Sequence, residues 1–243
     1  SDSTAAENTT PFVAFDFNDK VTSNYFNTGF GSIQSMSAFR RAPGFFDCVC
    51  YSGTGSARTV PHGLQKVPEM MWVKRRDATG FWSVYHKDVG ATKALLLHDT
   101  SAEFSSTVFN NTAPTSSVFS VDSTNRVNAS GGFFIAYLFA TLPGRSKVGS
   151  FTGGTNPLTV DCGFTSGARF VLIKSKQEAS WYLFDSVRGI VAGSDPSIRL
   201  DNANAQSTGD GDIIDPHSSG FTLVTTSGDY NGSGREYIFY AIA

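Results

Sequence analysis

Short apolar runs separated by turn residues alternate along almost the whole chain. The runs 70–74 and 82–85, for example, are joined by a polar loop, and the second run opens with Trp82. Short runs bounded by Gly, Ser, Asn and Pro are typical of β-strands, whereas the spacing of an amphipathic helix is hard to find anywhere. The pattern therefore predicts an all-β protein.

In the first half we predict strands at 46–51, 58–64, 70–74, 82–85, 93–98, 118–121 and 132–140. Pro143 follows the last of these, and proline cannot continue a strand ladder.

The pattern of the first half returns in the second. At an offset of 100 residues the second half repeats residues of the first half in order, with Tyr51, Gly53, Val60, Gly63 and Lys74 matched by Phe151, Gly153, Val160, Gly163 and Lys174. Trp82 matches Trp181 after a loop deletion, and Asn128 matches Asn231 at an offset of 103. Because the register slips only in loops, the chain contains a tandem repeat. We interpret Trp82 and Trp181 as packing residues, since both copies share them.

Each copy spans about 100 residues with about seven strands, which is typical of a β-sandwich. A single sheet could not bury both of its faces, so two sheets must stack. We predict two tandem β-sandwich units of the jelly-roll or lectin-like kind, residues 45–144 and 145–243, preceded by an extended N-terminal arm, residues 1–44.

The arm contains one segment with the alternation of a strand, at 12–17, where Phe15 and Phe17 share the face of Val13. A region rich in Gly, Ser and Asn follows at 22–37. We expect the arm to pack on a neighbour, either the next domain or another subunit. The chain begins with Ser1 rather than methionine, so we expect it to be part of a longer chain.

The composition excludes several classes of function. Charged residues make up only 16% and the net charge is −2, so nucleic-acid binding is not expected. No apolar stretch reaches the roughly 20 residues that span a bilayer, so we predict no membrane insertion. The three cysteines are too few and wrongly spaced for a disulfide framework or a zinc site, and we expect Cys48 and Cys50 to be free buried thiols.

Six segments of the sequence resemble the repeated β domain at the C-terminal end of tail-fibre and other tail structural proteins of marine tailed bacteriophages. The resemblance covers about residues 38–243, and the phrases that carry it are Thr59–Leu64 with Val67–Lys74, Cys162–Phe164 with Ala168–Lys174, Ala136–Gly144, and Asn231–Ala243. It implies an extracellular virion component at the tip of a homotrimeric fibre. The implied partners are other phage tail proteins and a host cell-surface glycan or protein.

The residues themselves offer little catalytic chemistry. A hydrolase needs paired carboxylates facing one cleft, and no motif joins Asp161, Asp185, Asp201 and Asp215. The resemblance supplies no catalytic residues, so we predict a non-enzymatic protein. No cofactor is expected either.

Three aspartates, Asp210, Asp212 and Asp215, lie close together on a glycine-bearing loop and could gather oxygen ligands for calcium. The loop lacks the later glutamate of an EF-hand. The alternative is a turn in which the aspartates accept bonds from nearby backbone amides, and we favour this reading.

Binding loops are expected where the two copies differ, because exposed loops on a rigid sandwich carry function. Two loops at equivalent positions combine aromatic or amide side chains, at 103–115 and 201–215. The candidate contacts are Phe104, Phe109, Asn110 and Asn111 in the first, Asn202, Asn204 and Gln206 in the second, and Tyr230 with Asn231 beside them. We also interpret Asn128 and Asn231 as turn residues just before the closing strand.

The sequence thus favours a tail-fibre protein that displays loops to the host surface. One alternative is a purely structural anchor or adaptor of the tail, in which the arm is the functional element. A second alternative is a carbohydrate-binding module of a secreted glycan-active protein.

Overall fold

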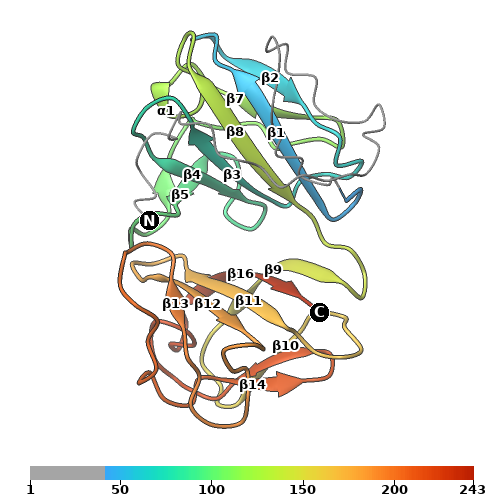
Figure 1. The fold of residues 1–243 in the computed structure, drawn as a ribbon, viewed down its shortest axis with the longest axis vertical. Helices are drawn as coiled ribbons and strands as arrows, with labels where there is room; N and C mark the ends of the chain where they lie inside the picture. The colour runs from blue at the N-terminus through green and yellow to red at the C-terminus, as the bar shows by residue number, and fades with distance from the viewer. Residues whose placement is uncertain (1–41) are drawn as a thin grey trace, which may run out of the picture.

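The computed structural model describes residues 42–243, and these residues form an almost entirely β structure (Figure 1). The prediction of an all-β fold built from β-sandwich units is confirmed. The strand predicted at 12–17 and the arm up to residue 41 lie outside the described residues. Between residues 42 and 243 no helix is long and apolar enough to cross a membrane.

Within the described part of the first half, residues 42–144, there are eight strands and a single helical turn. The elements are β1 (Phe46–Ser52), β2 (Arg58–Pro61), β3 (Met70–Arg75), β4 (Trp82–His86), β5 (Lys93–Leu96), β6 (Phe104–Ser105), β7 (Val118–Val121), α1 (Asn125–Asn128) and β8 (Phe133–Phe139). The sequence pattern predicted neither β6 nor α1, because each is shorter than the window over which periodicity can be recognised.

The second half also contains eight strands. They are β9 (Ser146–Thr152), β10 (Leu158–Asp161), β11 (Phe170–Ser175), β12 (Trp181–Asp185), β13 (Ile198–Arg199), β14 (Ile214–His217), β15 (Gly220–Leu223) and β16 (Glu236–Ile242).

Each half builds one large and one small antiparallel sheet. The large sheets have the strand orders β1-β8-β3-β4-β5-β6 and β13-β12-β11-β16-β9, and the small sheets have the orders β2-β7 and β10-β15-β14. All of these pairings lie within one half or the other. In both halves the last strand, β8 or β16, lies between the first strand of that half, β1 or β9, and the strand that contains the repeated lysine, β3 or β11.

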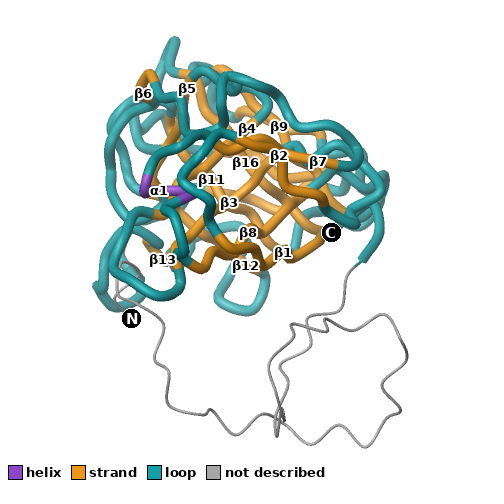
Figure 2. Tube along the Cα trace, turned by 90° about the horizontal axis from the view of Figure 1, so that it is seen from above, coloured by secondary structure: helices purple, strands orange, loops and turns teal. Residues whose placement is uncertain are grey.

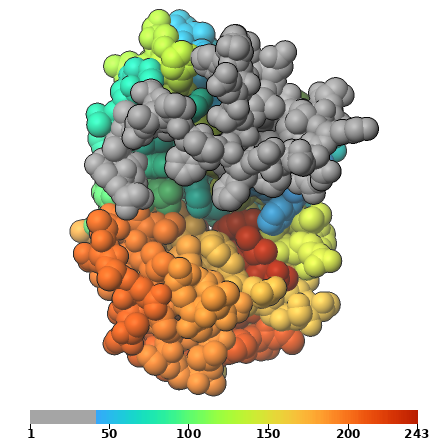
Figure 3. Space-filling model, viewed as in Figure 1, coloured from blue at the N-terminus to red at the C-terminus, as the bar shows by residue number. Residues whose placement is uncertain are grey.

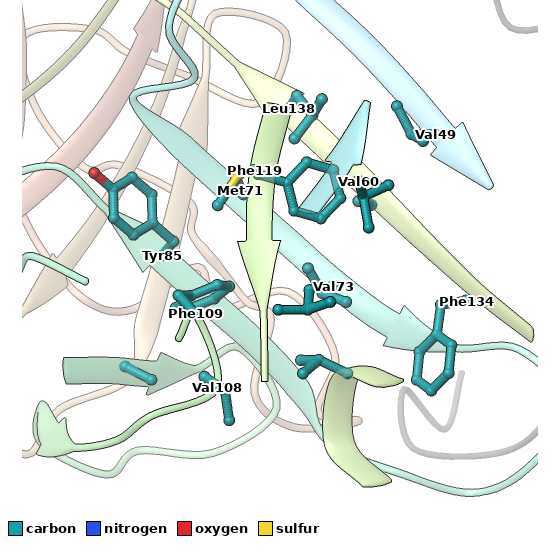
Figure 4. Packing of buried hydrophobic residues seen from close by; sticks show 14 of the residues in the cluster. Val49, Val60, Met71, Val73, Tyr85, Val108, Phe109, Phe119, Phe134 and Leu138 are labelled. Carbon is teal, nitrogen blue, oxygen red and sulfur yellow. The ribbon is translucent and has the colours of Figure 1, made fainter. Parts of the chain in front are cut away.

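One face of each large sheet packs on the small sheet of the same half. In the first half, Met71 and Val73 of β3 share a buried cluster with Val60 of β2 and Phe119 of β7 (Figure 4). The second half has the equivalent cluster, in which Phe239 of β16 takes part. Successive strand residues point to opposite faces, so these positions are the alternate residues of each strand.

The other face of each large sheet, called the outer face below, packs on the large sheet of the other half. Met70, Val84 and Leu95 of the first half share one buried cluster with Leu172 and Trp181 of the second. The indole Nε1 of Trp181 donates a hydrogen bond to the Leu96 carbonyl at 2.7 Å. The two halves are therefore stacked through their large sheets, as Figure 1 shows from the side and Figure 2 from above.

The repeated lysine near the end of β11 has a structural role. Lys174 is fully buried, and its Nζ donates to the carbonyls of Thr100, Gln177 and Ala179 at 3.2, 3.2 and 2.8 Å. Burial lowers the pKa of Lys174 to about 8. The ammonium group ties the hairpin loop of the second half to a carbonyl of the first, because a buried charge requires such partners.

One sequence expectation about the cysteines is wrong. Cys48 is buried as predicted, whereas Cys50 is exposed. Both lie on the outer face of β1, which is an edge strand, and the second half covers only part of that face.

The two copies fill one core position in opposite ways. The strand register pairs Val49 with Ala136 in the first half and Gly149 with Phe239 in the second. A Cβ at Gly149 would lie 2.8 Å from the Phe239 ring. The larger side chain of the pair is therefore on the first strand, β1, in the first half and on the last strand, β16, in the second half.

This exchange predicts a non-additive pair of mutations. We expect Gly149→Val to destabilise the fold by about 2 kcal/mol through overpacking, and Phe239→Ala by about 4 kcal/mol through a cavity. The double variant should recover at least about 1 kcal/mol of the sum, because it recreates the first-half pair. Urea unfolding of the four proteins measures this coupling, and strictly additive changes would contradict it.

The buried histidine at the contact between the halves predicts a pH dependence of stability. His86 is fully buried, its Nδ1 accepts a bond from the Asp88 backbone N–H at 3.2 Å, and burial lowers its pKa from 6.5 to about 4. A lowered folded pKa means that the unfolded chain binds the extra proton below pH 6.5, so stability falls as the pH drops toward 4. We expect His86 to cost about 2 kcal/mol of unfolding free energy between pH 7 and pH 5.

Urea unfolding at these two pH values checks the effect, with His86→Gln as the non-titrating reference. The variant should show a smaller pH dependence, whatever its absolute stability. An identical pH dependence in the two proteins would contradict the assignment.

Candidate functional site

The first predicted loop, 103–115, divides into a buried part and an exposed part. Phe109 is fully buried in the core of the first half, which removes it from any contact with a ligand. Phe104 is half-buried against the same core, with the Arg126 guanidinium 5.7 Å from its ring centre. Asn110 and Asn111 are exposed and have positive φ angles of 51° and 49°. This loop thus presents two amides on a tight turn.

The third predicted set, Tyr230 with Asn231, also belongs to the framework. Asn231 is fully buried, and its amide donates to the carbonyls of Thr155 and Thr225 at 2.6 and 2.8 Å. The equivalent Asn128 makes the same pattern of bonds, donating to Ser56 and Asp122. Tyr230 is 6% exposed and packs on Tyr182. We therefore remove Tyr230, Asn231 and Phe109 from the set of candidate ligand contacts.

The second predicted loop, 201–215, borders a surface pocket of about 230 Å³. Residues around 190–215 form an exposed face of the second half, coloured orange in Figure 3. The pocket is lined by Ser197, Arg199, Asn204, Ala205 and Ser207. Of the predicted residues, Asn204 lies in the lining, while Asn202 is exposed beside it and Gln206 accepts a bond from Arg188 Nε at 3.1 Å.

Arg199 is the only charged side chain in the lining of this pocket. Its guanidinium lies 5.4 Å from the centre of the Tyr182 ring, and a terminal nitrogen is 4.0 Å from Asp210. Asp210 is held in turn by Ser197, whose hydroxyl donates to it at 2.7 Å. The Nε of Arg199 is buried and has no hydrogen-bond partner among the described residues. The side chain of Arg199 is 37% exposed, so the pocket offers a positioned cation.

A buried carboxylate holds the two ends of the loop that lines the pocket together. Asp195 is fully buried and accepts bonds from the backbone amides of Ile213 and Ile214 at 2.7 and 2.9 Å. Burial raises the pKa of Asp195. A bridge between Ser197 and Ser207 closes the loop across the pocket. These contacts hold the pocket residues on a defined backbone.

Sequence reasoning missed Arg199, although the repeat contained a signal for it. Tyr182 pairs with Arg199 in the second half, and Ser83 pairs with Leu96 at the equivalent place in the first. An arginine thus replaces an apolar residue that is 7% exposed. The two copies differ at this position in charge as well as in shape, as expected of a residue with a role outside the fold.

The three aspartates proposed for calcium are not gathered into a metal site. Asp210 faces Arg199 and Ser197, as described above, and Asp212 bridges to Ser194 through its backbone. Asp215 lies on β14. Across residues 42–243 no group of three His, Cys, Asp or Glu side chains could hold a metal ion.

A second, larger cavity of about 440 Å³ lies where the two halves meet. Lys87 and Asp88 of the first half line it together with residues of β9 and β10 and the Phe239 ring. Lys87 is already paired with Glu69 at 2.8 Å. The lining of this cavity contains two lysines and two aspartates, so it favours no single charge of ligand, whereas the Arg199 pocket has one cation in its lining.

The chain belongs to the family described as Domain of unknown function (DUF7483), whose model matches residues 1–243. No curated protein and no solved structure matches the chain. The class of protein is therefore defined by this family and by the β-sandwich architecture.

Proposed function

We propose that the protein is a non-enzymatic component of a phage tail fibre that binds an acidic glycan of the host surface through the Arg199 pocket. The observation that carries this proposal is a surface pocket whose lining has one cation, no anion and several neutral polar groups. A lining with one cation and several neutral polar groups is complementary to a hydroxylated ligand that bears a carboxylate.

The geometry suits a single sugar residue. The pocket volume of about 230 Å³ is below the roughly 300 to 1,000 Å³ typical of sites for drug-sized ligands. The guanidinium of Arg199 can take a carboxylate through two parallel hydrogen bonds, and its side chain is 37% exposed, so a ligand can reach it. Asn204 and the hydroxyls of Ser197 and Ser207 are suited to sugar hydroxyls.

The resemblance to tail-fibre domains supplies the biological setting of the proposal. A shallow pocket binds a single sugar weakly, but a homotrimeric fibre presents three copies. Linked sites can raise the overall affinity by roughly 10² to 10⁴ without any new contact. Host attachment in this account needs only modest affinity at each pocket.

A purely structural role in the tail is the second candidate. The observation that favours it is the burial of Phe109, Tyr230 and Asn231, which turns three predicted contacts into parts of the framework. In that account the Arg199 pocket has no ligand.

Titration calorimetry with methyl glucuronide and methyl glucoside, which differ in the carboxylate, tests the proposal. We expect the purified chain to bind the glucuronide more tightly. Arg199→Gln should weaken that binding by about 10- to 100-fold, because a hydrogen bond to a charged group contributes about 1.5–3 kcal/mol.

Arg126→Gln is the matched control, since Arg126 lies beside the other predicted loop and should leave binding unchanged. Equal binding of both sugars, or no effect of Arg199→Gln, would contradict the acidic-glycan proposal. Loss of binding with Arg126→Gln alone would place the site on the first loop instead.

A further inference from the structure

The cavity where the two halves meet lies along the free edges of two strands. In the second half β9 is an edge strand of the large sheet, and β10 is an edge strand of the small sheet. The cavity lining includes residues 147–151 of β9 and residues 158–161, which form β10. Its volume of about 440 Å³ is within the roughly 300 to 1,000 Å³ of small-molecule sites. The cavity therefore has the size that a small ligand needs.

The edge of β9 offers free backbone groups to this cavity. Gly153 N donates to the Arg235 carbonyl at 2.9 Å, so the strand register makes the odd-numbered residues of β9 bond to β16. The even-numbered residues direct their N–H and C=O groups to the free edge, where Val148 N donates to Thr141 Oγ1 at 3.1 Å. Ser150 is the next such residue, and within residues 42–243 its backbone N–H and C=O have no hydrogen-bond partner.

The edge of β10 offers the same kind of groups. Cys162 N donates to the Ser219 carbonyl at 2.8 Å, so the even-numbered residues of β10 bond to β15 and the odd-numbered residues face outward. In the described part of the chain, the backbone N–H and C=O of Thr159 have no partner. Stacked sheets lie about 10 Å apart, which is about twice the 4.8 Å between paired strands. One planar amide group can therefore bond to both edges at once.

The two copies differ in the space beside these edges. In the first half Asp47 Oδ2 accepts a bond from Gly63 N at 2.6 Å, which ties β1 to the loop after β2. Lys147 stands in the place of Asp47 in the second half, and Gly149 stands in the place of Val49. The second half therefore lacks both this carboxylate and one apolar side chain at the cavity.

We propose that this cavity binds a neutral sugar that carries an acetamido group. The half-buried side chains of Phe151 and Leu158, with the Phe239 ring, form an apolar wall for the acetyl methyl group. The acetamido carbonyl accepts a hydrogen bond from the Ser150 N–H, and the acetamido N–H donates to the Thr159 carbonyl.

The charges of the lining and the short free edge favour this ligand. Two lysines and two aspartates line the cavity, so a ligand of either net charge meets side chains of the same sign, whereas sugar hydroxyls can bond to both kinds. An added peptide strand needs hydrogen bonds along several residues of an edge. Because Val148 N is already bonded, Ser150 is the one β9 residue of the lining with both backbone groups free. A single amide suits this edge better than a strand.

NMR titration of the isotope-labelled chain with methyl N-acetylglucosaminide and methyl glucoside, which differ in the acetamido group, tests this site. We expect the acetamido sugar to bind at least about tenfold more tightly, because it adds two hydrogen bonds and a buried methyl group. Its largest amide shifts should lie in residues 147–151 and 158–161. N-acetylalanine methylamide, which has the amide without the sugar ring, should bind more weakly. Equal binding of the two sugars, or of the acetamido sugar and the amide, would overturn the proposal.

Substitutions at Ser150 test the hydrogen bond to the acetamido carbonyl. Ser150→Pro removes the N–H at a free edge, where proline is tolerated, and should weaken binding of the acetamido sugar about fivefold. The matched control Ser150→Ala keeps the N–H and should bind like the original chain. Equal binding by these two variants would contradict the bond, and the sugar comparison does not depend on whether the proline variant folds.

This site is separate from the Arg199 pocket, so the two proposals can fail separately. Arg199→Gln should leave binding of the acetamido sugar unchanged, because Arg199 does not line this cavity. Loss of that binding in Arg199→Gln would place the acetamido sugar in the other pocket and would overturn the present assignment.

Discussion

The contact between the two large sheets is the interaction on which the rest of the structure depends. Each large sheet is apolar on both faces, so one face must pack on the small sheet of its own half and the other on the opposite half. Trp181 belongs to the buried cluster of this contact, is 1% exposed and donates a hydrogen bond to the Leu96 carbonyl. Neither sheet could expose such a face to water without a large loss of hydrophobic stabilisation.

Stacking the copies through equivalent faces makes the shared residues structural. Lys174 ties a hairpin loop to Thr100 of the other half, and Asn128 and Asn231 hold equivalent turns. We propose that function lies at positions where one copy departs from the other. Arg199 in place of Leu96 adds a charge at the surface of the second half, and Gly149 in place of Val49 removes a side chain at the cavity where the halves meet.

Much of the fold could be predicted from the sequence, because the tandem repeat and the alternating strands follow from local periodicity. The run Met70–Lys74 is apolar on both faces, which indicates burial on both sides but not the partner on each. Phe109 and Asn231 occur among turn residues and were therefore predicted to be exposed, yet their loops fold back onto the core. Arg199 lies on a two-residue strand, which is too short to recognise by pattern.

The central claim is that the two halves stabilise each other through their large sheets and therefore fold as one unit. Differential scanning calorimetry tests it directly, since a cooperative two-state transition has equal calorimetric and van't Hoff enthalpies. The account predicts one transition with a ratio near one, and with an enthalpy of about 0.7 kcal/mol per residue for both halves together. Two separate transitions, or a calorimetric enthalpy about twice the van't Hoff value, would show that each half folds independently and would contradict the account.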